Sequence, residues 1–240
     1  MRRQLKGGEH YDETTASALF VSAVDPGSRL LTAKGNDFGE GSSGSNGSVY
    51  MSCNSYMDKG RVKEVFFRGS GNRVVIKPFT TAFVRPSRFR FEFTEDSDLR
   101  AERFIVWRDG VSIRSWWSIK PETRYYETLG QALAGATGVS SQSAIVVPSM
   151  LFQNLGDTRR VQNLTELSLV TEEKVSGRPA YRIEGTDWMN TRVTLWIDKK
   201  TFLLVKLFEK RSGKVEVELT IQYEPQVNVD VLPDKLAFKH

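Results

Sequence analysis

The 240-residue sequence predicts an α+β fold, in which one large antiparallel sheet has helices packed on one of its faces. Segments of alternating apolar and polar residues recur along most of the chain, the pattern of half-buried strands. Tight-turn signals such as Asp109-Gly110 separate these segments, as in consecutive hairpins. One stretch rich in alanine and leucine, residues 121–155, interrupts the strands and has the spacing of helices.

The first part of the chain differs in composition from the rest. Residues 35–48 read GNDFGEGSSGSNGS, which is rich in glycine and serine and almost free of apolar side chains. Residues 16–24 are apolar, but this run is short and follows three acidic residues, so we do not predict a secretion signal there. We expect a flexible N-terminal segment and Gly/Ser linker over residues 1–48 and one folded domain over residues 49–240.

The clearest strand signal lies in residues 79–93, FTTAFVRPSRFRFEF, which contain five phenylalanines. In their second half, Phe89, Phe91 and Phe93 point to one face, and charged residues point to the other. Arg85-Pro86 marks a turn or a strand edge within this segment. Because aromatic side chains bury large areas, the phenylalanine face must be covered by helices or by an apolar ligand.

Further strands are expected wherever β-branched, aromatic or alternating residues recur. They cover residues 61–67, 73–77, 79–84, 89–93, 104–107, 111–117, 180–185, 192–197, 203–209 and 214–223. In the last of these, apolar and polar residues alternate from Val215 to Tyr223, the most regular amphipathic strand of the chain.

Residues 121–155 are expected to form two short helices. Leu129, Ala132, Leu133 and Ala136 recur at spacings of three and four, and alanine and leucine favour helices. A glycine- and serine-containing stretch at residues 138–141 divides the two. The expected order is therefore hairpins, two helices, then more hairpins.

Residues that commonly carry catalysis or bind metals are scarce. The two histidines, His10 and His240, stand at opposite ends of the chain, which does not favour a Ser-His-Asp or Cys-His site. Cys53 is the single cysteine, so no thiol pair is available for zinc, and we expect it to be a small buried side chain. We therefore predict no enzyme activity, no cofactor and no metal site.

The charge pattern does not favour nucleic-acid binding. The net charge of +5 is spread along the chain. Arg88 and Arg90 interleave with phenylalanines, but on a strand they face away from them. A surface that stacks single-stranded bases needs aromatic and basic groups on the same face, so we expect no nucleic-acid partner.

Bulky apolar side chains leave two interpretations open: a plain packed core, or a cavity that receives an apolar ligand. The candidate lining residues are Phe79, Phe83, Phe89, Phe91, Phe93, Trp107, Trp117, Trp196 and, on the helical stretch, Leu151.

Five short motifs, in order, resemble the outer-membrane lipoprotein carrier superfamily, the LolA/LolB-like proteins, and in particular its lipoprotein-sorting branch. The resemblance covers residues 49–239, nearly the whole expected domain. The motifs are YMDKG at residues 56–60, FVRPSRFRFEF at 83–93, GRPAYRIEG at 177–185, LWID at 195–198 followed by Thr201, and YEPQVNVDVLPDKLAFK at 223–239.

The resemblance implies a curved antiparallel sheet, an open and incomplete β-barrel of about eleven strands, with helices as a lid over its concave apolar face. It further implies a non-enzymatic carrier that binds the acyl chains of a lipid or an acylated lipoprotein in the periplasm. The envelope membrane and lipoprotein-handling proteins are the further partners it suggests. Arg85 matches the arginine that contacts the lid. A protein-interaction or envelope-stress sensor module with a packed core is the alternative on this fold.

Overall fold

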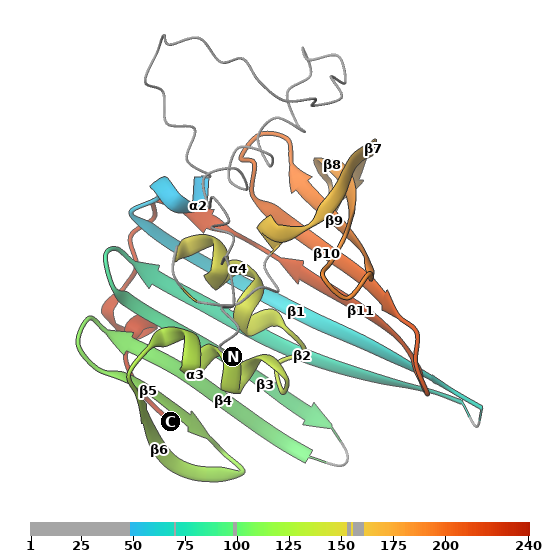
Figure 1. Ribbon diagram of the computed structural model, residues 1–240. Helices are drawn as coiled ribbons and strands as arrows, with labels where there is room; N and C mark the ends of the chain where they lie inside the picture. The colour runs from blue at the N-terminus through green and yellow to red at the C-terminus, as the bar shows by residue number, and fades with distance from the viewer. Residues whose placement is uncertain (1–48, 70, 98–99, 153–154, 156–160) are drawn as a thin grey trace, which may run out of the picture.

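In the computed structural model, the described residues form one antiparallel sheet with helices on one face (Figure 1). The described residues are 49–69, 71–97, 100–152, 155 and 161–240. The strands are β1 (Ser55–Arg68), β2 (Gly71–Val84), β3 (Arg88–Ser97), β4 (Arg100–Asp109), β5 (Ile113–Trp117), β6 (Lys120–Tyr126), β7 (Thr165–Val175), β8 (Arg178–Thr186), β9 (Arg192–Asp198), β10 (Leu204–Arg211), β11 (Glu216–Tyr223) and β12 (Gln226–Val227). The helices are α2 (Val49–Ser52), α3 (Leu129–Thr137) and α4 (Ser143–Leu151), with the short 3₁₀ turns η1 (Val161–Asn163) and η2 (Pro233–Leu236).

The sheet is open. Its order is β6-β5-β4-β3-β2-β1-β11-β10-β9-β8-β7, and β12 pairs with β1 beside this path. Strands β6 and β7 are therefore its two edges, and the barrel does not close. This arrangement confirms the predicted α+β class and the incomplete barrel of about eleven strands. The flexible segment predicted for residues 1–48 lies outside the described residues.

The five phenylalanines of residues 79–93 share one face of β2 and β3. Phe79 lies opposite Phe93, and Phe83 lies opposite Phe89, in the antiparallel register of the two strands. Phe89, Phe91 and Phe93 are fully buried. We call these five side chains the phenylalanine ladder. The turn at residues 85–87 joins β2 to β3, as the Arg85-Pro86 pair predicted.

Helices α3 and α4 cover this face (Figure 1). Helix α3 begins with a capping box, in which the Thr128 hydroxyl accepts from the Gln131 backbone N–H and the Gln131 side chain accepts from the Thr128 N–H. Every residue of α4 is buried. The two predicted helices are confirmed, and the break between them falls at residues 138–142. In the described part of the chain, no helix has the length and apolar character needed to span a bilayer.

The C-terminal segment covers part of the opposite, convex face. Val231 and Leu236 pack on Ala82 there. The indole Nε1 of Trp107 donates to the Leu236 carbonyl at 2.6 Å, and the Trp107 and Phe238 rings lie 5.5 Å apart. The sheet is thus covered on both faces where β1 to β4 meet.

The strand predictions missed both edges of the sheet. The edge strands β6 and β7 were not expected. In addition, residues 73–77 and 79–84, expected as two strands, form the single strand β2. Both edge strands are exposed along most of their length, so neither has the alternation of a half-buried strand. Two register irregularities interrupt the pairing of β7 with β8, which further weakens a periodic pattern.

Gly60 on β1 makes room for an aromatic contact across the strand. It lies directly opposite both Phe79 on β2 and Tyr223 on β11. The Phe79 and Tyr223 rings meet edge to face over it, with centroids 5.5 Å apart. A Cβ added at Gly60 would lie 2.0 Å from Phe79 Cζ, so a side chain here has to displace the ring.

We expect Gly60→Ala to lower the free energy of unfolding by about 1–3 kcal/mol, the usual cost of overpacking a core. Urea unfolding followed by tryptophan fluorescence measures the change. Gly69→Ala is the control, because a Cβ there meets nothing within 4 Å. Equal effects of the two substitutions would contradict the steric role of Gly60.

Candidate ligand-binding site

The structure gathers most of the predicted ligand-binding residues into one buried cluster between the sheet and the helices. The phenylalanine ladder and Leu151 belong to this cluster, and Trp117 packs at its margin. Leu133 and Ala136 of α3 and Val147 of α4 face the same cluster and are fully buried. Sequence reasoning did not name these three as site residues, although their helical spacing placed them on the apolar side.

Trp107 and Trp196 lie elsewhere, which corrects their assignment to the same surface as the ladder. Trp107 is paired with Arg90 and so shares the convex face with it. Trp196 packs with Ala180 and Val205 in a separate small cluster, and Lys206 Nζ lies 4.0 Å from its ring centroid. The prediction grouped the tryptophans by size and did not follow the alternation of each strand, which decides the face.

The rings of the ladder are in contact with the residues that cover them. Phe152, directly after α4, meets Phe83 and Phe89 edge to face at centroid distances of 5.0 and 5.6 Å. Phe93 stacks on Phe104 at 6.0 Å, and Phe104 meets Trp117 at 5.9 Å. In this conformation the helical cover touches the ladder directly.

A buried carboxyl group lies at one end of this cluster, among tyrosines. Asp58 Oδ2 accepts from the Tyr56 hydroxyl at 2.7 Å, and Oδ1 accepts from the Thr81 N–H at 2.9 Å. Burial raises the pKa of Asp58 to about 6, although both hydrogen bonds oppose the shift. Burial also raises the pKa of Tyr223 well above its usual value, and its hydroxyl has no hydrogen-bond partner among the described residues.

Arg85 contacts α2 instead of the α3–α4 pair. Its Nε donates to the Cys53 carbonyl at 2.8 Å, and one terminal nitrogen donates to the Tyr50 carbonyl at 3.1 Å. Arg85 thus binds carbonyl groups at the end of the short helix α2, where a cation is favourable. We expected Arg85 to contact a helical lid within residues 129–155. It contacts α2 in its place, because the β2–β3 turn lies beside α2.

Cys53 is buried, as predicted, with only 1% of its surface exposed. Burial raises the pKa of its thiol, and the nearby Arg85 only partly opposes the shift. The thiol donates to the Tyr50 carbonyl. A protonated, buried thiol is a poor nucleophile.

Polar side chains of three strands hold the connection between α3 and α4. Lys77 Nζ donates to the Val139 carbonyl at 2.7 Å, the Ser141 hydroxyl donates to Glu64 at 2.6 Å, and the Gln142 amide donates to Glu209 at 3.1 Å. We call these three contacts the lid latch.

The lid latch holds a connection in which two residues have an unfavourable backbone conformation. Ser141 and Gln142 have φ values of 52° and 69°, in the left-handed region that disfavours side chains other than glycine. Lys77 is also within 3.3 Å of Glu95 and 3.9 Å of Glu64, and it is 8% exposed. A buried lysine between two carboxylates makes stronger contacts than an exposed ion pair.

The arrangement offers a large apolar contact surface. Within the described ranges, no group of three or more His, Cys, Asp or Glu side chains is placed to hold a metal ion. The cluster consists of aromatic and aliphatic side chains, with Asp58 and the tyrosines at one end.

No protein-family model and no curated protein matches the sequence. Solved structures do match. The MucA/MucB complex of Pseudomonas aeruginosa is 15% identical with a TM-score of 0.40, over 80% of this chain and 58% of that chain, so this chain spans less than two thirds of it. The lipoprotein LppX of Mycobacterium tuberculosis is 14% identical, with a TM-score of 0.42 and coverage of 77% and 91%.

A LolA superfamily protein of Nitrosomonas europaea is 12% identical, with a TM-score of 0.31 and coverage of 80% and 94%. At such identities the function has to be inferred from the residues of this chain.

The first prediction from the site concerns the pH dependence of stability. With a folded pKa of about 6 against 3.8 for the unconstrained group, Asp58 binds its proton more tightly in the folded state. Protonation of Asp58 therefore stabilises the folded state by about 3 kcal/mol below pH 4, and this stabilisation is lost as the pH rises to 6. We expect Asp58→Asn to abolish this decrease in the free energy of unfolding with rising pH. Urea unfolding of both proteins between pH 4 and pH 8 measures it, and identical pH profiles would refute the role of Asp58.

The second prediction concerns the lid latch. We expect Lys77→Met to speed hydrogen exchange of the backbone amides in residues 139–151 by about tenfold or more, because a charged hydrogen bond and its ion pairs are lost. Hydrogen–deuterium exchange mass spectrometry measures the rates. Lys63→Met, at an exposed lysine of the neighbouring strand, is the control. A uniform increase across the whole sheet would show that Lys77 supports global stability and does not hold the lid.

Proposed function

We propose that the protein binds the acyl chain of a lipid or a lipoprotein on the concave face of its sheet, without catalysing a reaction. One observation carries the proposal. A continuous ladder of five buried phenylalanines is covered by two helices of nine residues each, and the connection between these helices is fixed by the lid latch. Displacing so small a cover exposes an apolar surface of the kind that lines ligand sites.

The energetics of an exchange between lid and ligand are favourable. Each methylene that leaves water for an apolar site contributes about 0.8 kcal/mol, so a chain of a dozen carbons compensates for a considerable loss of helix contacts. Helices α3 and α4 present several small side chains to the ladder, among them Ala132, Ala136 and Ala144. Their contacts are individually modest, and acyl methylenes replace them without loss of apolar burial.

The motif resemblance supports a place in the cell envelope, in the periplasm, and a role in moving the bound chain between partners. An acylated lipoprotein or a free lipid is the cargo, and the envelope membrane or lipoprotein-handling proteins supply and receive it. Opening of the α3–α4 pair gates exchange, with the lid latch as the contact that breaks.

A second candidate function is a protein-interaction or envelope-stress sensor module. The contacts of Phe152 with Phe83 and Phe89 favour it, because they show that the helical cover and the ladder pack directly on one another. In that case the ladder is a structural core and the partner binds elsewhere.

Binding of a fluorescent fatty-acid probe to delipidated protein tests the choice. We expect the wild type to bind the probe, and we expect Phe91→Asp and Phe152→Asp to weaken binding at least tenfold, because a carboxylate beside an acyl chain loses its hydration. Phe152 is only half-buried, so its substitution disturbs folding less than that of Phe91.

Ile76→Asp is the matched control. It adds the same charge to the same sheet, but on the convex face, where Ile76 is 45% exposed. Circular dichroism confirms that each variant is folded. Failure of the wild type to bind the probe would reject acyl binding and favour the interaction module, as would equal effects of Phe152→Asp and Ile76→Asp.

A further inference from the structure

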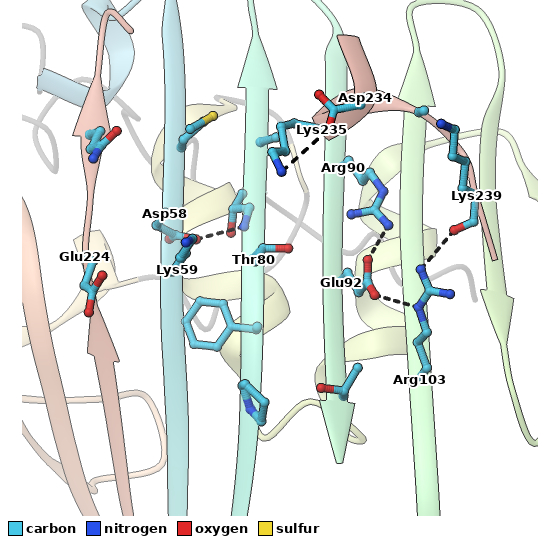
Figure 2. A pocket seen from close by; sticks show the side chains of 18 residues that line it. Asp58, Lys59, Thr80, Arg90, Glu92, Arg103, Glu224, Asp234, Lys235 and Lys239 are labelled. Carbon is cyan, nitrogen blue, oxygen red and sulfur yellow. Dashed lines mark hydrogen bonds and ion pairs between the residues drawn. The ribbon is translucent and has the colours of Figure 1, made fainter. Parts of the chain in front are cut away.

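A cavity lined by both charged and apolar residues lies on the convex face, on the side of the sheet opposite the rings of the phenylalanine ladder. Its volume is about 570 Å³, within the range of small-molecule sites. Strands β1 to β4 form its floor, and the C-terminal segment crosses over one side of it. Figure 2 shows Lys59 and Glu224 at one side, Arg90, Glu92 and Arg103 at the other, and the helices behind the strands.

The cavity carries an excess of positive charge. Its basic lining residues are Lys59, Arg90, Arg103, Lys235 and Lys239, and its acidic ones are Asp58, Glu92, Glu224 and Asp234. The carboxyl group of Asp58 is bonded to Tyr56 and the Thr81 N–H, so it does not balance the cations at the opening. Five basic side chains therefore face three available carboxylates.

Two of these carboxylates are already paired within the protein. Glu92 accepts from Arg103 Nε at 2.6 Å and also forms an ion pair with Arg90, which leaves this triad with one net positive charge. Asp234 pairs with Lys235 at 3.6 Å. Arg103 also donates to the Lys239 carbonyl at 3.1 Å, which ties the C-terminal segment to the wall of the cavity.

Arg90 is the most constrained of the cations. Its side chain is 12% exposed, and its Nε is buried without a hydrogen-bond partner among the described residues. Arg108, Arg114 and Arg182 also have a buried Nε without a partner among the described residues, and Arg114 and Arg182 have aromatic rings under their guanidinium groups. Arg90 lines the cavity, and its guanidinium group, which is paired with Glu92, has further N–H donors that suit an anionic acceptor.

We propose that this cavity binds a small molecule or headgroup that carries a phosphate. Arg90 donates to the phosphate oxygens, Lys235 and Lys59 supply further positive charge from the rim, and the remaining volume accommodates a polar body such as glycerol. Guanidinium groups suit phosphate because they present several donors in a fixed geometry. Phe79 is shared between the cavity lining and the ladder, but its ring lies against Tyr223 on the ladder's face of the sheet, so the proposal does not depend on acyl binding.

Isothermal titration calorimetry with glycerol 3-phosphate and with inorganic phosphate tests the site. We expect glycerol 3-phosphate to bind, Arg90→Gln to weaken it at least tenfold, and Lys235→Gln to weaken it about threefold. In Arg90→Gln, Glu92 keeps its partner Arg103. Lys235→Gln changes a side chain that is 56% exposed, so it leaves the fold intact. Lys214→Gln, an exposed lysine outside the cavity, is the charge-matched control.

Flotation with phosphatidylglycerol vesicles distinguishes the two sources of phosphate. Binding of glycerol 3-phosphate in solution identifies a soluble phosphate compound, and binding to vesicles alone, with the same sensitivity to Arg90→Gln and Lys235→Gln, identifies a lipid headgroup. The proposal is overturned if neither probe binds, or if Lys214→Gln weakens binding as much as the two cavity variants.

Discussion

Burial of one aromatic face of the sheet is the constraint on which the rest of the structure depends. Alternation along β2 and β3 places five phenylalanine rings on the concave side, and water contact with so large an apolar area would be strongly unfavourable. The chain interrupts its series of hairpins with α3 and α4, which return to cover these rings. The helical insertion buries that face, and the lid latch holds the connection between its two helices.

The same alternation gives the convex face a different chemistry. Arg90 stands between Phe89 and Phe91 in sequence, but its side chain lies with Glu92 and Arg103 beneath the C-terminal segment. One strand therefore contributes to an apolar surface on one side and to a charged cavity on the other. The two proposed ligands would therefore lie on opposite faces of the sheet.

Much of the fold could be predicted from the sequence, because the central strands and α3 show clear periodicity, and α4 is a short run of mostly apolar residues that is buried throughout. The ladder was predicted for the same reason. The edge strands β6 and β7 lack alternation, since solvent reaches most of their side chains. The faces of Trp107 and Trp196 depend on strand register, and the partners of Arg85 and Lys77 are set by tertiary contacts with α2 and with the α3–α4 connection. Such contacts leave no local signal in a sequence.

We propose that an acyl chain displaces the helical cover of the ladder. The most direct measurement is hydrogen–deuterium exchange of the delipidated protein with and without oleic acid. We expect oleic acid to alter exchange in α3, α4 and residues 138–142 and to leave the C-terminal segment on the convex face unchanged. Unaltered exchange in the two helices at saturating oleic acid, or a change confined to the convex face, would contradict it.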